Sequence, residues 1–161
     1  MKPRIVILGV GNLLRSDDGV GVHAAQALAD DPPGNAEVVD AGTDVLSALP
    51  FLENASHALI IDALRAGGEP GEIRVFRESD IACSEGARTA HAVNILSARH
   101  LMTPGSLWPE IAILGVEPAR LDYGLSLSPA VAASLPQLVR RCREVAASWS
   151  SETLHQQGIP A

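Results

Sequence analysis

Short apolar runs alternate with stretches of helical spacing along most of this chain. The runs are four to seven residues long, and most of them lack the polar alternation of a half-exposed strand. Runs of this kind are typical of strands buried on both faces of a sheet. The predicted strands are residues 4–8, 37–41, 58–63, 72–77 and 110–116.

Between these runs, apolar residues recur every three or four positions, which predicts helices. The predicted helices follow Gly19, cover 44–52, begin near His91 and begin at Pro129. Ser128 and Pro129 form a typical helix start, with serine as N-cap and proline in the first turn. Alternation of strand and helix predicts a three-layer α/β sandwich around a mostly parallel sheet.

Two segments do not follow the alternation. The glycine-rich turn at 67–71 is too short for a crossover helix, so strand 72–77 is expected to be antiparallel at a sheet edge. Residues 79–90 are small and polar without a clear period, and we interpret them as a flexible loop. We expect residues 1–149 to form one domain and residues 150–161 to be a flexible tail.

The composition narrows the class of protein. The chain has 161 residues, of which 47% are hydrophobic and 3% aromatic, so the core should be aliphatic. A net charge of -7 argues against nucleic acid and anionic membranes as partners. No apolar stretch approaches the roughly twenty residues of a membrane span. We therefore expect a cytoplasmic protein.

Aspartates follow three of the predicted strands. Asp17 and Asp18 come after the first strand and its glycine turn, Asp40 ends the second, and Asp62 ends the third. Because the carboxyl ends of parallel strands share one edge of the sheet, these side chains should converge there. His91, at a helix start, adds an imidazole, so Asp18, Asp62 and His91 are candidate ligands of a divalent metal.

Other kinds of site fit less well. Gly9 and Gly11 suggest a dinucleotide fingerprint, but the third glycine is missing and two aspartates would repel a pyrophosphate. No P-loop and no G-x-S-x-G motif occurs. The two cysteines are far apart, which excludes a disulfide scaffold. Cys83 is expected to have no special reactivity, and Cys142 to lie in the core.

Each aspartate also has an ordinary structural interpretation. Asp17 or Asp18 can cap the following helix, and Asp17 is the expected cap. Asp40, before a glycine and a threonine, suits a turn. Asp62 follows three apolar residues, where a carboxylate is costly unless it is paired or coordinating, so here function is favoured. His91 alone would be interpreted as structural.

Taken together, these motifs resemble those of the hydrogenase maturation endopeptidases, which process the large subunit of nickel–iron hydrogenases. The similarity extends over about residues 4–147. It rests on ILGVGNLLRSDDGVG, VVDAGT, LIIDAL, PGEIRVF, TAH and LGVEP followed by GLSLSPAV, in this order.

This resemblance implies a twisted five-stranded sheet with helices on both faces. It implies an endopeptidase that cuts a C-terminal extension from the hydrogenase large-subunit precursor after nickel insertion. The substrate's nickel would be engaged by Asp18, Asp62 and His91, so the isolated enzyme need not hold a metal. Asp17, Asp40 and Thr43 are expected to support the site or position the substrate.

Two mechanisms and one rival function remain open at this point. The nickel either polarises the scissile carbonyl or activates water, or it only docks the precursor while a carboxylate acts as general base. The rival is a nickel-binding accessory or sensor protein that cuts nothing. We expect a monomer that binds the hydrogenase precursor.

Overall fold

A computed structural model describes residues 3–83 and 90–156 of the chain. Its five strands form one sheet in the order β2-β1-β3-β5-β4. All neighbouring strands are parallel except β4 and β5, which are antiparallel. The predicted fold class, including the antiparallel edge strand, is therefore confirmed. The strands are β1 Ile5–Val10, β2 Ala36–Gly42, β3 His57–Ala63, β4 Ile73–Arg77 and β5 Glu110–Val116.

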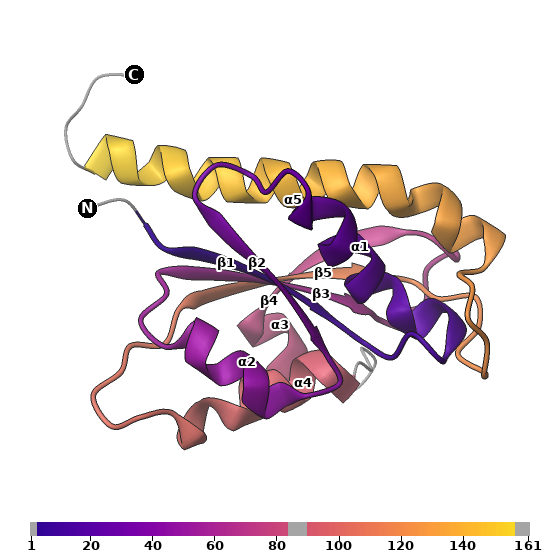
Figure 1. Ribbon diagram of the computed structural model, residues 1–161, viewed down its shortest axis with the longest axis horizontal. Coiled ribbons are helices and arrows are strands. Elements are labelled where there is room, and N and C mark those ends of the chain that lie inside the picture. Colours follow the sequence, from indigo (N-terminus) through magenta and orange to yellow (C-terminus); the bar gives the residue numbers. More distant parts are fainter. Residues whose placement is uncertain (1–2, 84–89, 157–161) are drawn as a thin grey trace.

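Helices cover both faces of the sheet (Figure 1). Helices α1 and α5 pack on one face and enclose one apolar cluster, while α2 and α4 enclose the other. The helices are α1 Val20–Ala29, α2 Val45–Leu52, α3 Glu78–Cys83, α4 Ala90–Ser97 and α5 Pro129–Gln156, with short 3-10 turns η1 Ser16–Gly19 and η2 Ala98–Leu101. No helix within the described ranges is long and apolar enough to cross a membrane.

The strand order puts a topological switch point between β1 and β3. The chain leaves β1 through α1 to reach β2 on one side, and then returns through α2 to β3 on the other side of β1. After β3 the chain continues through β4 and α4 to β5, away from β1, and α4 lies on the face opposite to α1. The connections that leave the carboxyl ends of β1 and β3 therefore diverge. Ligand sites of open α/β sheets lie at this position.

Close packing of α1 against this point depends on two glycines. A methyl group on Gly21 would overlap the carbonyl oxygens of Val10 and Ile61, and one on Gly9 would overlap the carbonyl oxygen of Gly21. The start of α1 therefore lies directly on the ends of β1 and β3. This contact positions the loop between β1 and α1 over the carboxyl edge of the sheet.

Two expectations from the sequence are wrong in part. Residues 79–83, predicted as loop, belong to α3, whose first turn is closed by a hydrogen bond from Arg77 N to Asp80 Oδ2 (2.7 Å). Helix α5 continues to Gln156, so residues 150–156 are helical where a flexible tail was predicted. The last residue of the predicted loop, Ala90, begins α4, while residues 84–89 and 157–161 lie outside the described part of the chain.

We predict that Gly21→Ala destabilises the protein, although alanine favours helices more than glycine does. The added methyl group has only backbone carbonyls of the sheet to displace, so we expect a loss of roughly 2–3 kcal/mol in urea unfolding. Gly68→Ala is the matched control, because its methyl group would meet the movable Glu72 carboxylate. Equal stability of the two variants would contradict the packing described above.

Candidate active site

Asp18 and His91 meet at the carboxyl edge of the sheet. His91 Nε2 lies 3.0 Å from Asp18 Oδ2, and both side chains are mostly buried. Asp18 comes from the turn η1 after β1, and His91 from the first turn of α4, 73 residues later. The sequence predicted both residues, and the structure brings them into direct contact.

Backbone geometry aims Asp18 at this point. Gly11 has φ +133°, and a side chain there would overlap the carbonyl oxygen of Asp18, so glycine lets the loop fold back on itself. The backbone N–H of Asn12 then donates to Asp18 Oδ2 at 3.0 Å. Asp18 Oδ2 is therefore held between the loop backbone and the His91 ring.

Asp62, at the end of β3, is fully buried beside this pair. The backbone N–H of Ala92, the residue after His91, donates to Asp62 Oδ2 at 3.0 Å. The hydrogen bond ties the start of α4 to β3 at the switch point. The structure thus places Asp62 next to the helix turn that carries His91.

The charges in this group shift one another's pKa values. Burial raises the pKa of Asp18, but hydrogen bonds from His91 and Asn12 outweigh burial and leave the pKa below its ordinary value. The hydrogen bond to Asp18 raises the pKa of His91, and the charge of Asp62 adds to this effect. Burial raises the pKa of Asp62 to about 7, against the opposing charge of His91.

The three side chains do not form a ready-made metal cage. In residues 3–83 and 90–156, no group of three or more His, Cys, Asp and Glu side chains could hold a metal ion in the positions observed. Asp18 Oδ2 and His91 Nε2, the atoms that would face a metal, are hydrogen-bonded to each other instead. A metal bound here would have to replace this hydrogen bond.

Asp17 has a different role from the predicted helix cap, and that prediction is wrong. Its fully buried carboxylate accepts hydrogen bonds from Ala119 N, Arg120 N, Ser128 N and the Ser128 hydroxyl, at 2.7–3.1 Å. Burial raises the pKa of Asp17, but these hydrogen bonds outweigh it and lower the pKa overall. Asp17 therefore anchors the segment between β5 and α5 to the loop that carries Asp18.

Asp40 and Thr43 lie at the carboxyl end of β2, on the same edge of the sheet as Asp18. Asp40 Oδ1 accepts from Gly42 N at 3.1 Å, which is the turn that the sequence suggested. Both residues, together with Gly11 and Asn12, line an open hollow of about 210 Å³. A hollow thus borders the loop on which Asp18 is carried.

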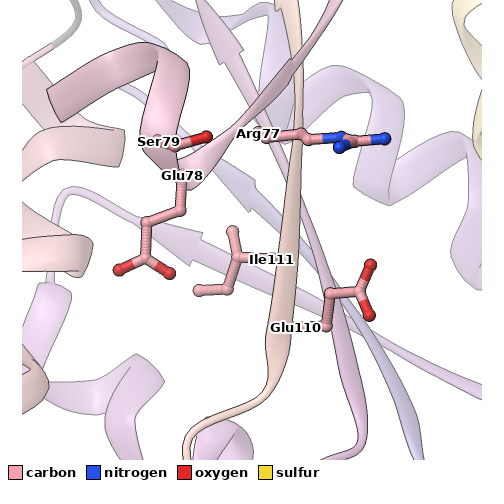
Figure 2. Close-up of a pocket in the computed structure, with 5 residues that line it drawn as sticks. All are labelled: Arg77, Glu78, Ser79, Glu110 and Ile111. Carbon is pink, nitrogen blue, oxygen red and sulfur yellow. The ribbon is translucent and has the colours of Figure 1, made fainter. Parts of the chain in front are cut away.

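A larger hollow of about 530 Å³ lies elsewhere, between β4, α3 and the start of β5. Figure 2 shows Arg77 and Glu110 on one side of β5 and Glu78 on the other. This larger hollow lies at the amino end of β5, whereas Asp18, Asp62 and His91 lie at the carboxyl ends of β1 and β3. The larger hollow is therefore separate from the candidate site.

Sequence reasoning missed three residues that shape the site. Asn12 supplies the N–H to Asp18, Ser128 binds Asp17, and Arg15 Nε donates to the carbonyl of Leu121 at 3.1 Å. Ser128 was expected only as a helix cap. A local sequence pattern cannot indicate the contacts of Arg15 with Leu121 and of Ser128 with Asp17, because each joins residues more than a hundred positions apart in the chain.

Comparison with known proteins identifies relatives for most of the chain. The family profile described as "Hydrogenase maturation protease" matches residues 22–144, which include Asp62 and His91. The hydrogenase expression/formation protein HupD of Rhodobacter capsulatus is 32% identical over 160 residues, covering 94% of this chain and 75% of HupD. The hydrogenase 2 maturation protease of Escherichia coli is 30% identical, covering 88% and 92%.

Solved structures have the same fold. The hydrogenase maturating endopeptidase HybD of Escherichia coli superposes with a TM-score of 0.74 at 28% identity, covering 96% of this chain and 94% of that one. The [NiFe] hydrogenase maturation protease HybD of Thermococcus kodakarensis gives 0.76 at 28% identity, covering 89% and 99%. The likeness extends over nearly the whole of both chains.

We predict that Asp62 makes stability depend on pH between about 4 and about 7. Its pKa rises from 3.8 to about 7 on folding, so the folded state favours the protonated acid and loses stability as pH rises through this range. Asp62→Asn removes this loss. In chemical unfolding from pH 4 to 8, the free energy of unfolding of the variant should rise relative to that of the wild type by a few kcal/mol. The difference should stop growing above about pH 7. Parallel pH profiles would contradict the buried position of the carboxyl.

We also predict that the pKa of His91 depends on both aspartates. NMR titration of the His91 ring should give a lower pKa in Asp18→Asn, which loses the largest raising effect, and a smaller decrease in Asp62→Asn. Asp31→Asn is the control, because Asp31 is an exposed residue paired with Arg143. An unchanged His91 pKa in Asp18→Asn would show that the two side chains do not pair in solution.

Proposed function

The chain belongs to the family of hydrogenase maturation proteases, and from this premise we propose that it cuts the large-subunit precursor of a nickel–iron hydrogenase. The reaction removes a C-terminal extension after nickel has been inserted into the precursor. The nickel belongs to the substrate; Asp18 and His91 bind it, and Asp62 acts beside them on the scissile bond. One observation supports this proposal above the others: the contact between Asp18 and His91 beside buried Asp62.

Nickel is recognised by His91 Nε2 and Asp18 Oδ2, the two atoms that are hydrogen-bonded to each other. Imidazole nitrogen and carboxylate oxygen are both suitable ligands for a divalent transition metal. A nickel ion presented by the precursor takes the place of the proton shared by His91 Nε2 and Asp18 Oδ2, and this proton is released to solvent. Because the pair satisfies itself in the absence of substrate, neither group is left as an unpaired charge.

Asp62 has the properties of the general base. With a pKa of about 7, its carboxyl is partly ionised at neutral pH, as proton transfer from water requires. Nickel next to the pair adds positive charge, which favours the ionised form of Asp62. The ionised carboxylate then accepts a proton from the water that attacks the scissile carbonyl, and it returns this proton to the leaving amine as the C–N bond breaks. In this mechanism, activation of the base follows arrival of the metal.

The hollow lined by Asp40 and Thr43 is our candidate for the substrate chain next to the scissile bond. It borders the loop of Asp18, and it is open rather than enclosed, as an extended peptide requires. Glycine at position 42, with φ +53°, keeps its wall free of a side chain. We assign Asp40 and Thr43 to substrate positioning, and Asp17 to support of the loop.

The alternative of a nickel-binding accessory protein uses the same side chains without cleavage. The names of the relatives favour cleavage, because several are called maturation proteases or endopeptidases. We propose that the enzyme works as a monomer. We place it in the cytoplasm, where a newly made precursor is first available.

We predict that Asp62→Asn and His91→Gln each reduce processing by at least about a hundredfold, since each removes a group that acts on the reacting centre. The assay incubates the enzyme with nickel-loaded precursor and follows the precursor's mass. Exposed residues of the same types provide matched controls, Asp31→Asn and His100→Gln, which should process normally.

Binding of the same precursor separates the roles of the residues. We expect Asp62→Asn to retain the nickel-loaded precursor without cutting it, as a base variant should, and His91→Gln to bind it weakly. Loss of binding in both variants would make Asp62 a ligand rather than the base. If the wild-type enzyme binds the precursor and releases no C-terminal peptide, the accessory function is correct and the endopeptidase is not.

A further inference from the structure

Large apolar side chains are exposed on two segments next to the proposed site. Leu13 and Leu14 lie on the loop before Asp18, and their side chains are 36% and 59% exposed. Tyr123 and Leu125, on the segment between β5 and α5, are 88% and 76% exposed. We call these four residues the apolar rim. Exposed apolar groups collected in one region mark surfaces of protein interaction.

Backbone hydrogen bonds hold the two segments side by side. Gly124 N donates to the carbonyl of Leu14 at 3.0 Å, and Ser16 N donates to the carbonyl of Gly124 at 2.9 Å. These bonds form an isolated parallel bridge between Arg15 and Gly124. In Figure 1 the orange segment before α5 lies beside the indigo turn that precedes α1. The rim residues flank this bridge on both strands.

Asp17 fixes the same pair of segments from below the surface. Its buried carboxylate binds the backbone at Ala119, Arg120 and Ser128, on either side of the rim residues Tyr123 and Leu125. A surface held in this way loses little conformational entropy when a partner binds. The backbone that carries the rim is therefore held in place by hydrogen bonds on both segments.

We propose that the apolar rim is the docking surface for the folded body of the precursor whose terminus enters the site. This inference rests on the proposed function and adds to it the surface that the partner contacts. Leu14 precedes Asp18 by four residues on the same loop, so a protein that delivers a chain terminus to Asp18 lies against the rim. Contacts at the rim hold the precursor, while Asp18 and His91 test it for nickel.

The arrangement separates binding from chemistry. The rim side chains do not contact Asp62 or His91 in any hydrogen bond or ion pair described for this part of the chain. Removing them should therefore weaken the complex without changing the reacting groups. Because a few buried apolar or aromatic anchors carry most of the binding energy of an interface, two substitutions suffice for the test.

The experiment compares Leu14→Ser/Leu125→Ser with Leu101→Ser/Leu107→Ser. The control residues are 55% and 70% exposed, and they lie on the connection to the amino end of β5, away from the site. With nickel-loaded precursor, we expect KM of the rim variant to rise at least about tenfold and kcat to stay within about twofold. The control variant should match the wild type. Thermal unfolding checks that both variants fold.

Each outcome has a definite meaning. An unchanged KM in the rim variant, with normal processing by the wild type, overturns the rim and leaves the proposed function standing. If the wild-type enzyme binds the precursor without cutting it, the proposed activity is wrong. The rim is then tested by the affinity of each variant for the precursor, and equal affinities of the rim variant and the control variant overturn the rim. If light scattering shows a wild-type dimer that only the rim variant loses, the rim binds a second copy of this chain and the proposal is wrong.

Discussion

A buried carboxylate in this fold is either saturated with hydrogen bonds or held partly protonated, and the carboxyl edge of the sheet contains one of each kind. Asp17 accepts from three backbone N–H groups and a hydroxyl, so its pKa falls and it remains a stable anion. At Asp62 burial dominates and the pKa rises to about 7. Neither aspartate is accessible to solvent, but their pKa values move in opposite directions, because Asp62 is packed more deeply and Asp17 accepts more hydrogen bonds.

The sequence predicted the strands and the three candidate residues because the causes are local. An aspartate directly after apolar strand residues is costly, which identified Asp62. Parallel strands bring their carboxyl ends to one edge, which added Asp18 from the turn after the first strand. The role of Asp17 could not be predicted in this way. Its partners, at 119–128, are more than a hundred residues away, and only the folded chain shows that they meet. Helix α3 was missed because its first turn is closed by a single capping bond, to Asp80, in a segment without apolar periodicity.

Close packing at the switch point connects these observations. Gly9 and Gly21 bring α1 onto the ends of β1 and β3, where a dinucleotide-binding fold would use its third glycine. Here the same approach leaves the β1–α1 loop above the edge, with Asp17 turned inward and Asp18 turned toward α4. Asp17 and Asp18, neighbours in the short 3-10 turn η1, therefore have different roles. One holds the surface segment in place, and the other meets His91.

The hydrogen bond between Asp18 and His91 also bears on how a protease of this family would be restrained. A carboxylate and an imidazole that satisfy each other offer little to a peptide that arrives without a metal. A divalent ion changes this balance, because it replaces one shared proton with two positive charges beside a carboxyl whose pKa is near neutrality. Under the proposed mechanism, the same event that breaks the pair ionises the base. Cleavage then depends on the cargo of the precursor rather than on the sequence of its extension.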